Sequence, residues 1–207
     1  MTTLLPQQLV AFGERGMCSK ADKLWGNSRG KRLVDVVGSL VGLCIAGPIA
    51  LAGMALLAAG RKRSAGWWKV EDCVGKGTSP FRQFSFNIDD VSDRLVWVKF
   101  FMLRWGLDRV PQLWNVLGGE MSLVGPEAGS KKDLERYRWE IPAYGVRHLV
   151  RPGLTGKAQI SGWGGKRNVR KRAVIDSTYV REASLKQDLA VIFRALAPGL
   201  VYGPAID

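Results

Sequence analysis

The sequence predicts an α-rich α/β protein that is monotopic. A re-entrant, Pro-kinked membrane helix holds it on one face of a membrane, beside interfacial amphipathic helices and a small cytosolic domain. Three observations predict this class: residues 36–60 are apolar and uncharged, Pro48 lies near their middle, and basic residues flank both ends. About 25 apolar residues are enough to cross a bilayer core as a helix. Pro48 removes a backbone donor and clashes with the preceding turn, so we expect a kink there.

The charged flanks favour a helix that enters and leaves by the same leaflet. The flanking cations are Arg29, Lys31 and Arg32 before the apolar run, and Arg61, Lys62 and Arg63 after it. Cationic flanks prefer the cytoplasmic side. Each arm of about 12 residues would measure roughly 18 Å, which is too short to span. A single-pass helix with a kink remains an alternative, whereas the lack of a polar face disfavours the buried helix of a soluble domain.

The composition indicates a polyanionic partner. The net charge is +13 and the pI about 10.1, which suits nucleic acid, an anionic membrane surface or a phosphorylated substrate. The three cysteines, Cys18, Cys44 and Cys73, form neither a metal-binding spacing nor a disulfide framework. They indicate a reducing, cytosolic location. The apolar run starts too late for a secretory signal.

The chain divides into three expected segments: an N-terminal flexible segment (1–29), the membrane helix (30–63) and a cytosolic and interfacial domain (64–207). Asp35 follows Arg32 by three positions and is expected either to pair with it or to remain exposed. Residues 61–69 contain Trp67 and Trp68 among cations and predict an interfacial segment. Residues 74–80 predict a turn, and the alternation in residues 81–88 predicts a short strand.

Four helices are expected after this strand. Residues 91–103 form an amphipathic helix that lies on the membrane. Residues 108–117 form a short helix with Pro111 near its start and Gly118-Gly119 at its end. Residues 130–144 form a charged surface helix. A basic run at 166–172 precedes a last helix over residues 175–196.

Residues 104–126 contain the groups that chemistry on a phosphorylated substrate needs. Asp108 lies next to Arg109 and four residues after Arg104. A carboxylate among cations stays ionised, which suits a nucleophile or a metal ligand, although an Asp at a helix start is also a common cap. One histidine and no cysteine pair disfavour a zinc site. The chain lacks both a Gly-x-Ser-x-Gly elbow and a Gly-x-x-x-x-Gly-Lys phosphate loop.

Several motifs together resemble one family. They are residues 31–35 before an apolar run broken at Pro48, the stretch 107–126, residues 151–156, and the later Asp176, Tyr179 and Asp188. In this order they resemble the bacterial sugar transferases, the monotopic phosphoglycosyl transferases, over about residues 30–197. The resemblance implies a re-entrant helix and transfer of a sugar-1-phosphate from a UDP-sugar to polyprenol (undecaprenyl) phosphate. It places this reaction at the cytoplasmic face of the bacterial inner membrane, where it initiates polysaccharide or glycoconjugate synthesis.

The resemblance also implies site residues and a cofactor. It implies Mg²⁺ and a covalent phosphosugar intermediate on the Asp of an Asp-Glu dyad. Asp108 matches this Asp and is expected to be both nucleophile and metal ligand. Arg104, Arg109 and Arg151 are the expected phosphate-binding residues. The further site candidates are Glu120, Glu127 and Asp176.

The chain departs from the family pattern at three polar places. Arg109 stands where the dyad has Glu, Glu127 stands where a Gly-Pro-Arg-Pro loop has Arg, and the usual Lys-Phe-Arg reads Ser85-Phe86-Asn87. One hypothesis is that Arg109 and Glu127 compensate as an exchanged charge pair. A non-catalytic family member that binds lipid phosphate or scaffolds a partner is the alternative function. A nucleic-acid partner is not expected, because no recognised module accompanies the net charge.

Overall fold

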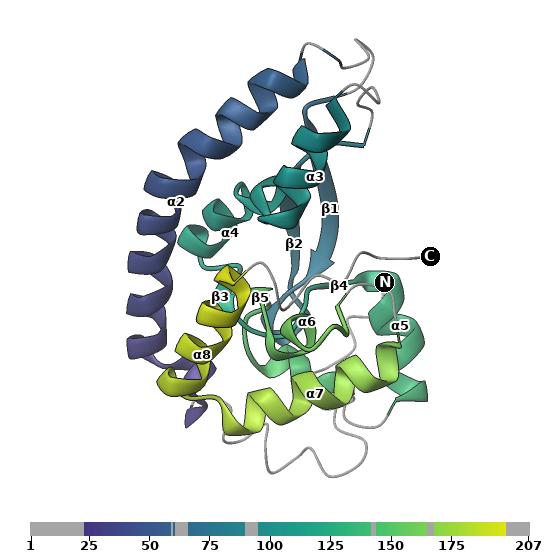
Figure 1. The fold of residues 1–207 in the computed structure, drawn as a ribbon. Coiled ribbons are helices and arrows are strands. Elements are labelled where there is room, and N and C mark those ends of the chain that lie inside the picture. Colours follow the sequence, from purple (N-terminus) through teal and green to yellow (C-terminus); the bar gives the residue numbers. More distant parts are fainter. Residues whose placement is uncertain are drawn as a thin grey trace.

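A computed structural model describes residues 23–58, 60, 66–89, 95–141, 144–164 and 168–197 (Figure 1). Helices predominate, and the strands form two small sheets. The order is η3 (Trp25–Asn27), α2 (Arg29–Ala58), β1 (Trp68–Val74), η4 (Lys76–Thr78), β2 (Pro80–Phe86), α3 (Val96–Arg104), η6 (Leu107–Arg109), α4 (Gln112–Gly118), β3 (Ser122–Val124), β4 (Gly129–Ser130), α5 (Lys131–Glu140), η7 (Tyr144–Leu149), β5 (Gly153–Thr155), α6 (Lys157–Ile160), α7 (Val169–Glu182) and α8 (Leu185–Leu196). The predicted α-rich α/β class is confirmed.

The apolar run forms α2, which extends along one side of the molecule (Figure 1). It is one helical element of 30 residues with Pro48 inside it. Its inner face buries Ala50, Met54 and Leu57 in a core cluster shared with α3 and α4. Much of the remaining surface is open, and Leu33 is 66% exposed. Within the described ranges α2 is the one helix whose length and composition would allow it to cross a membrane. The second basic flank, 61–63, lies outside the described residues.

The first turn of α2 contains a buried ion pair that differs from the expected one. Asp35 accepts a hydrogen bond from Lys31 Nζ at 2.9 Å. The Arg32 guanidinium instead donates to the carbonyl oxygens of Val116 and Leu117 in α4. Lys31 and Asp35 are each 1% exposed. The two predictions for Asp35, an ion pair with Arg32 or an exposed carboxylate, were therefore both wrong. Arg32 and Lys31 lie three and four positions before Asp35, and either spacing allows a contact on a helix surface. Contacts with the rest of the fold therefore decide which of the two cations pairs with Asp35.

Strands β1 and β2 form an antiparallel hairpin joined through η4. The predicted strand over 81–88 is confirmed as β2. Strand β1 was not predicted: its first two residues were assigned to an interfacial segment, its last to a turn, and residues 70–73 to no element. It also pairs with β4, giving the order β2-β1-β4. Lys69 and Glu71 lie two positions apart on β1, opposite Ser85 and Gln83 of β2, so these four residues share a face of the hairpin.

The predicted helices after the hairpin are found with adjusted ends. The helix expected over 91–103 is α3, described from Val96, and 91–94 lie outside the described residues. The stretch 108–117 divides into η6 and α4, and Gly119 ends α4 with a left-handed φ of 87°, as the Gly118-Gly119 signal predicted. Helix α5 ends at Glu140, and Ser130 begins it with a capping box.

The last helix predicted over 175–196 is two helices. Helix α7 ends at Glu182, and Ser184 then caps α8 by accepting a hydrogen bond from the Gln187 amide. The described part of the basic run, 168–172, belongs to the start of α7, and its Arg172 is buried. The capping Ser was the missed signal, because a Ser at this position satisfies the first free amides of a new helix.

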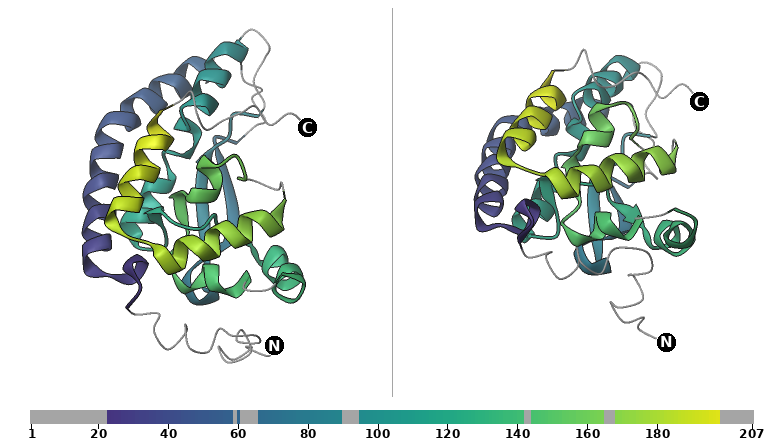
Figure 2. Two further views of the ribbon diagram at one scale, coloured as in Figure 1. Left: turned by 60° about the horizontal axis from the view of Figure 1, so that its bottom comes forward. Right: turned by 90° about the horizontal axis from the view of Figure 1, so that it is seen from below.

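Exposed apolar side chains continue from α2 onto two shorter helices. In α8 they are Leu185, Leu189, Phe193 and Leu196, spaced as on one helix face, and in α3 they include Val96, Trp97 and Phe100. Helix α8 runs beside α2 in both views of Figure 2, and Lys31 Nζ also lies 3.1 Å from Asp188 Oδ2 of α8. The molecule therefore carries apolar surface on several neighbouring helices.

Candidate active site

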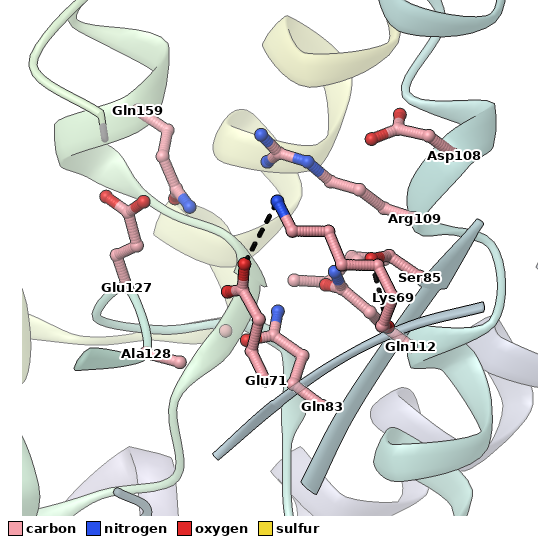
Figure 3. Close-up of a pocket in the computed structure, with 12 residues that line it drawn as sticks. Lys69, Glu71, Gln83, Ser85, Asp108, Arg109, Gln112, Glu127, Ala128 and Gln159 are labelled. Atoms are coloured by element: carbon pink, nitrogen blue, oxygen red, sulfur yellow. Dashed lines mark hydrogen bonds and ion pairs between the residues drawn. The ribbon is translucent and has the colours of Figure 1, made fainter. Parts of the chain in front are cut away.

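A cavity of about 210 Å³ opens between the β1–β2 hairpin, η6, α4 and the loops after β3 and before α6. The residues that line it are mostly polar: Lys69, Glu71, Gln83, Ser85, Asp108, Arg109, Gln112, Glu127, Ala128, Gly153, Leu154 and Gln159. Figure 3 shows Asp108 and Arg109 on one side of the cavity and Glu127 and Gln159 on the opposite side. The β-strand residues lie between these two walls.

The first wall is the short helix η6. Gly106 enters it with a left-handed φ of 64°, a conformation that glycine adopts without steric cost. Leu107 and Val110 are buried in the core cluster beneath, which directs Asp108 and Arg109 to the cavity. Burial raises the pKa of the Asp108 carboxyl, while the Arg109 guanidinium acts in the opposite direction. Because Gly106 precedes η6 and Pro111 precedes α4, Asp108 does not cap either helix.

The second wall depends on two loops whose backbones touch. Strands β3 and β5 pair in parallel. Beyond them the Gly125 amide donates to Thr155 O at 3.0 Å, and the Gly153 amide donates to Pro126 O at 2.8 Å. An added Cβ at Gly153 would lie 2.1 Å from Gly125 N, so only glycine fits there. This contact explains the glycines in both loop motifs, and it presents Glu127 at the cavity.

Buried charges support Glu127 from behind. Arg172 Nη1 lies 3.1 Å from Glu127 Oε2. Arg147 donates to the Glu127 carbonyl oxygen, and its Nη2 lies 2.9 Å from Asp176 Oδ2. Burial raises the pKa of the Asp176 carboxyl to about 6, against the lowering effect of Arg147 and Arg172. Asp176 therefore lies behind the wall and is not among the residues that line the cavity.

The other predicted site residues are held elsewhere. Arg151 Nε donates to Gly119 O at 2.7 Å, and Glu120 accepts from Asn115 Nδ2 at 2.6 Å. Arg104 ends α3. These three predicted residues do not line the cavity, whereas Asp108, Arg109 and Glu127 do.

Sequence reasoning missed several lining residues. Lys69 and Glu71 form an ion pair at 3.1 Å on the open side of the cavity, and the bond to Glu71 raises the pKa of the Lys69 ammonium. Their spacing of two is the strand signal that could have identified them. Gln159 lies in α6, and no local pattern distinguishes it from an ordinary core residue.

The side chains of the cavity could bind Mg²⁺ only together with phosphate oxygens of the substrate and water. Among the described residues no group of three or more His, Cys, Asp or Glu side chains could hold a metal. Mg²⁺ usually keeps several waters and binds one or two carboxylates together with substrate phosphates. Asp108 is a carboxylate that lines the cavity. The carboxylates of Glu71 and Glu127 also line the cavity, but they form ion pairs with Lys69 and Arg172. Asp108 is therefore the lining carboxylate that best fits the role of a protein ligand of such an ion.

Fold and site together define a class: a helix-rich protein in which a long apolar helix accompanies a cavity lined by charged and polar side chains. The chain belongs to the bacterial sugar transferase family, whose model matches residues 26–200. This match covers the helix α2, both cavity walls and helices α7 and α8.

Three relatives illustrate the similarity. The UDP-glucose:undecaprenyl-phosphate glucose-1-phosphate transferase of Klebsiella pneumoniae is 33% identical over 188 residues, 83% of this chain and 40% of that protein. The UDP-N-acetylgalactosamine-undecaprenyl-phosphate N-acetylgalactosaminephosphotransferase of Aeromonas hydrophila is 28% identical over 94% of this chain and 45% of that protein. The exopolysaccharide production protein PSS of Rhizobium leguminosarum is 30% identical over 84% of this chain and 96% of that protein. The chain spans less than half the length of the first two.

Proposed function

We propose that this protein transfers a sugar-1-phosphate from a UDP-sugar to undecaprenyl phosphate, at the cytoplasmic face of the bacterial inner membrane. The product would initiate a polysaccharide or glycoconjugate. Family membership and the names of the relatives support the reaction class. The observation that carries the proposal is the position of Asp108, a carboxylate that lines the charged cavity and caps no helix.

In the proposed reaction Asp108 attacks the β-phosphorus of the UDP-sugar. The bond from this phosphorus to the bridging oxygen breaks, UMP leaves with that oxygen, and an acyl phosphate bearing the sugar forms on Asp108. An oxygen of undecaprenyl phosphate then attacks the same phosphorus and releases the Asp108 carboxylate. Dividing the displacement into two steps means that both substrates need not be bound together. Arg109, which lines the cavity beside Asp108, is positioned to offset the phosphate charge.

Mg²⁺ is the proposed cofactor, with Asp108 as its protein ligand. When bound, such an ion offsets repulsion between the carboxylate and the diphosphate. Asp108 itself supplies the nucleophilic oxygen, and burial of this carboxyl raises its pKa. The reaction therefore requires a pH above that pKa.

The membrane arrangement is also a proposal. We infer that α2 enters and leaves the cytoplasmic leaflet, with a bend at Pro48 and both basic flanks at the headgroups. The exposed apolar residues of α3 and α8 would lie at the same interface and contact membrane lipids. Such a placement brings the cavity to the level where a polyprenol phosphate presents its head group. Labelling that found the two flanks on opposite sides of the bilayer would contradict it.

The test of the activity is UMP release by the full chain in detergent, with Mg²⁺, undecaprenyl phosphate and a panel of UDP-sugars. Replacing Asp108→Asn should abolish release, because an amide cannot act as the nucleophile. Asp72→Asn is the matched control, since the Asp72 side chain is 92% exposed on β1 and does not line the cavity. Without acceptor lipid, the wild type should gain the mass of one phosphosugar. Unchanged UMP release by Asp108→Asn would remove Asp108 from this role.

One observation favours a second function. Arg109 occupies the place of the dyad Glu, so the carboxylate that the family pattern has directly beside Asp108 is missing. A non-catalytic member would bind undecaprenyl phosphate or scaffold a partner enzyme and release no UMP from any UDP-sugar. The same assay, combined with a lipid-binding measurement, separates the two functions.

A further inference from the structure

We propose that Glu127 and Gln159 form the part of the cavity that binds the transferred sugar, by accepting hydrogen bonds from its hydroxyl groups. This inference rests on the proposed function and adds a substrate class to it. The site would take a UDP-linked neutral sugar in preference to one that carries a carboxylate.

The position of the two side chains follows from the chemistry of the opposite wall. In the proposed reaction the phosphorus under attack lies at Asp108, and the sugar is attached to that same phosphate. Figure 3 shows Glu127 and Gln159 across the cavity from Asp108 and Arg109. The cation of Arg109 suits phosphate oxygens, whereas a carboxylate at Glu127 repels them. The part of the substrate that faces Glu127 is therefore uncharged, and the sugar is the uncharged part that is bonded to the phosphate under attack.

Gln159 supplies an independent observation. Its side chain is 7% exposed, and its Oε1 atom is buried without a hydrogen-bond partner among the described residues. A buried acceptor without a partner costs about 1–3 kcal/mol, so such atoms call for a donor. The carboxylate of Glu127 is a second acceptor on the same wall. A carboxylate acceptor beside an amide that offers both an acceptor and donors matches the hydroxyl groups of a sugar, and the carboxylate of Glu127 disfavours an anionic group at the same place.

Glu127 is held in place from two directions. Arg172 Nη1 binds the carboxylate at 3.1 Å, and Arg147 donates to the backbone carbonyl. Both arginines are buried, at 5% and 2% exposure. The backbone contact of Gly125 with Gly153 then fixes the loop from which Glu127 projects. A carboxylate can accept about four hydrogen bonds, so the bond to Arg172 is compatible with a sugar hydroxyl at the same group. A fixed acceptor loses little entropy when the sugar binds.

The experiment compares ligands that differ only at the sugar. The full chain carrying Asp108→Asn, which prevents turnover, is titrated in detergent with UDP-glucose, UDP and UDP-glucuronic acid. Adding Glu127→Gln should weaken binding of UDP-glucose about tenfold, because a hydrogen bond to a charged acceptor becomes one to a neutral amide. Binding of UDP should stay unchanged. With Glu127 present, UDP-glucuronic acid should bind more weakly than UDP-glucose. In the Glu127→Gln variant the difference between these two affinities should be smaller.

Two variants keep the result interpretable. Glu135→Gln is the matched control, because Glu135 is a largely exposed residue of α5 outside the cavity, and it should leave all three affinities unchanged. Glu127→Asp keeps the charge and should recover part of the UDP-glucose affinity. An equal loss for UDP and UDP-glucose would assign Glu127 to the nucleotide or to folding and overturn the proposal, as would no change for either ligand. Sugar-dependent binding by a wild type that releases no UMP would leave this inference standing and remove the proposed catalysis.

Discussion

Lys31 Nζ lies 2.9 Å from Asp35 Oδ1 and 3.1 Å from Asp188 Oδ2, and all three side chains are at most 2% exposed. The contact joins the first turn of the apolar helix α2 to α8, near the other end of the chain. Trp25 Nε1 and Tyr179 Oη also donate to Asp188, at 2.8 and 2.6 Å. The N-terminal end of α2 is therefore fixed to the rest of the fold by a buried, hydrogen-bonded group of charges.

Replacing Lys31→Met should destabilise the protein by about 3–5 kcal/mol, because it leaves two carboxylates buried without their cation. Thermal unfolding in detergent micelles measures the effect. Lys131→Met is the matched control. Lys131 is 82% exposed and pairs with Glu135 at 4.0 Å, and such surface pairs contribute about 0–1 kcal/mol. Equal melting temperatures for the two variants would show that the buried group does not stabilise the fold.

Gly153→Ala should both destabilise the protein and reduce its activity. Its Cβ would meet Gly125 N at 2.1 Å, and forced overpacking costs about 1–3 kcal/mol. The loop that presents Glu127 must then move. Gly118→Ala serves as the control, because nothing lies within 4 Å of its added Cβ. Melting temperature and UMP release report the two effects, and a Gly153→Ala protein that matched the control in both would contradict the loop contact.

Arg109→Gln should move the acidic limb of the pH–rate profile to higher pH. The Arg109 guanidinium lowers the pKa of Asp108, against the raising effect of burial. Removing it raises the pKa further, so the Asp108 carboxylate is protonated, and the nucleophile lost, at a higher pH than in the wild type. The measurement is kcat/KM against pH.

The control for this prediction is Arg109→Lys, which keeps the positive charge and should move the limb less. The midpoint of the limb is the quantity that decides, since either change can lower the rate itself by weakening phosphate binding. An Arg109→Gln midpoint equal to that of the wild type would mean that Arg109 does not act on Asp108.

The exchanged-pair hypothesis for Arg109 and Glu127 receives a competing explanation from the structure. Both residues line the cavity, but Glu127 forms an ion pair with Arg172. Glu127→Arg would place a second guanidinium beside Arg172. We therefore expect the double change Arg109→Glu with Glu127→Arg to release UMP no faster than the better single variant. A double variant clearly more active than both singles would restore the exchanged pair.

The two strands of the hairpin differ in how well the local sequence pattern predicts them. In β2 aromatic residues alternate with polar ones, and the strand was predicted. In β1 the alternation covers only the four residues from Trp68 to Glu71, all of them exposed, and the tryptophans Trp67 and Trp68 beside cations were interpreted as an interfacial segment. Strand β1 is defined by its pairing with β2 and β4, and such pairing between separate segments is not encoded in the spacing of one segment.

The candidate site divides in the same way. Asp108, Arg109 and Glu127 were predicted, because they occupy motif positions within a short stretch. Lys69 and Gln159 were missed, because they reach the cavity only when the hairpin packs beside η6 and α6 closes the opposite wall. Asp176, predicted to bind phosphate or to order the site, lies behind the cavity wall and is bound to Arg147.

By itself the sequence determined the apolar helix, strand β2, the end of α4 at Gly119 and the family motifs, because composition and spacing over a few residues carry these signals. Only the tertiary structure decided that Lys31 rather than Arg32 pairs with Asp35, and that Glu127 and Gln159 face Asp108. These choices depend on contacts between segments distant along the chain. The physical reason is that several local arrangements have nearly equal free energy, and packing against the rest of the fold selects one of them.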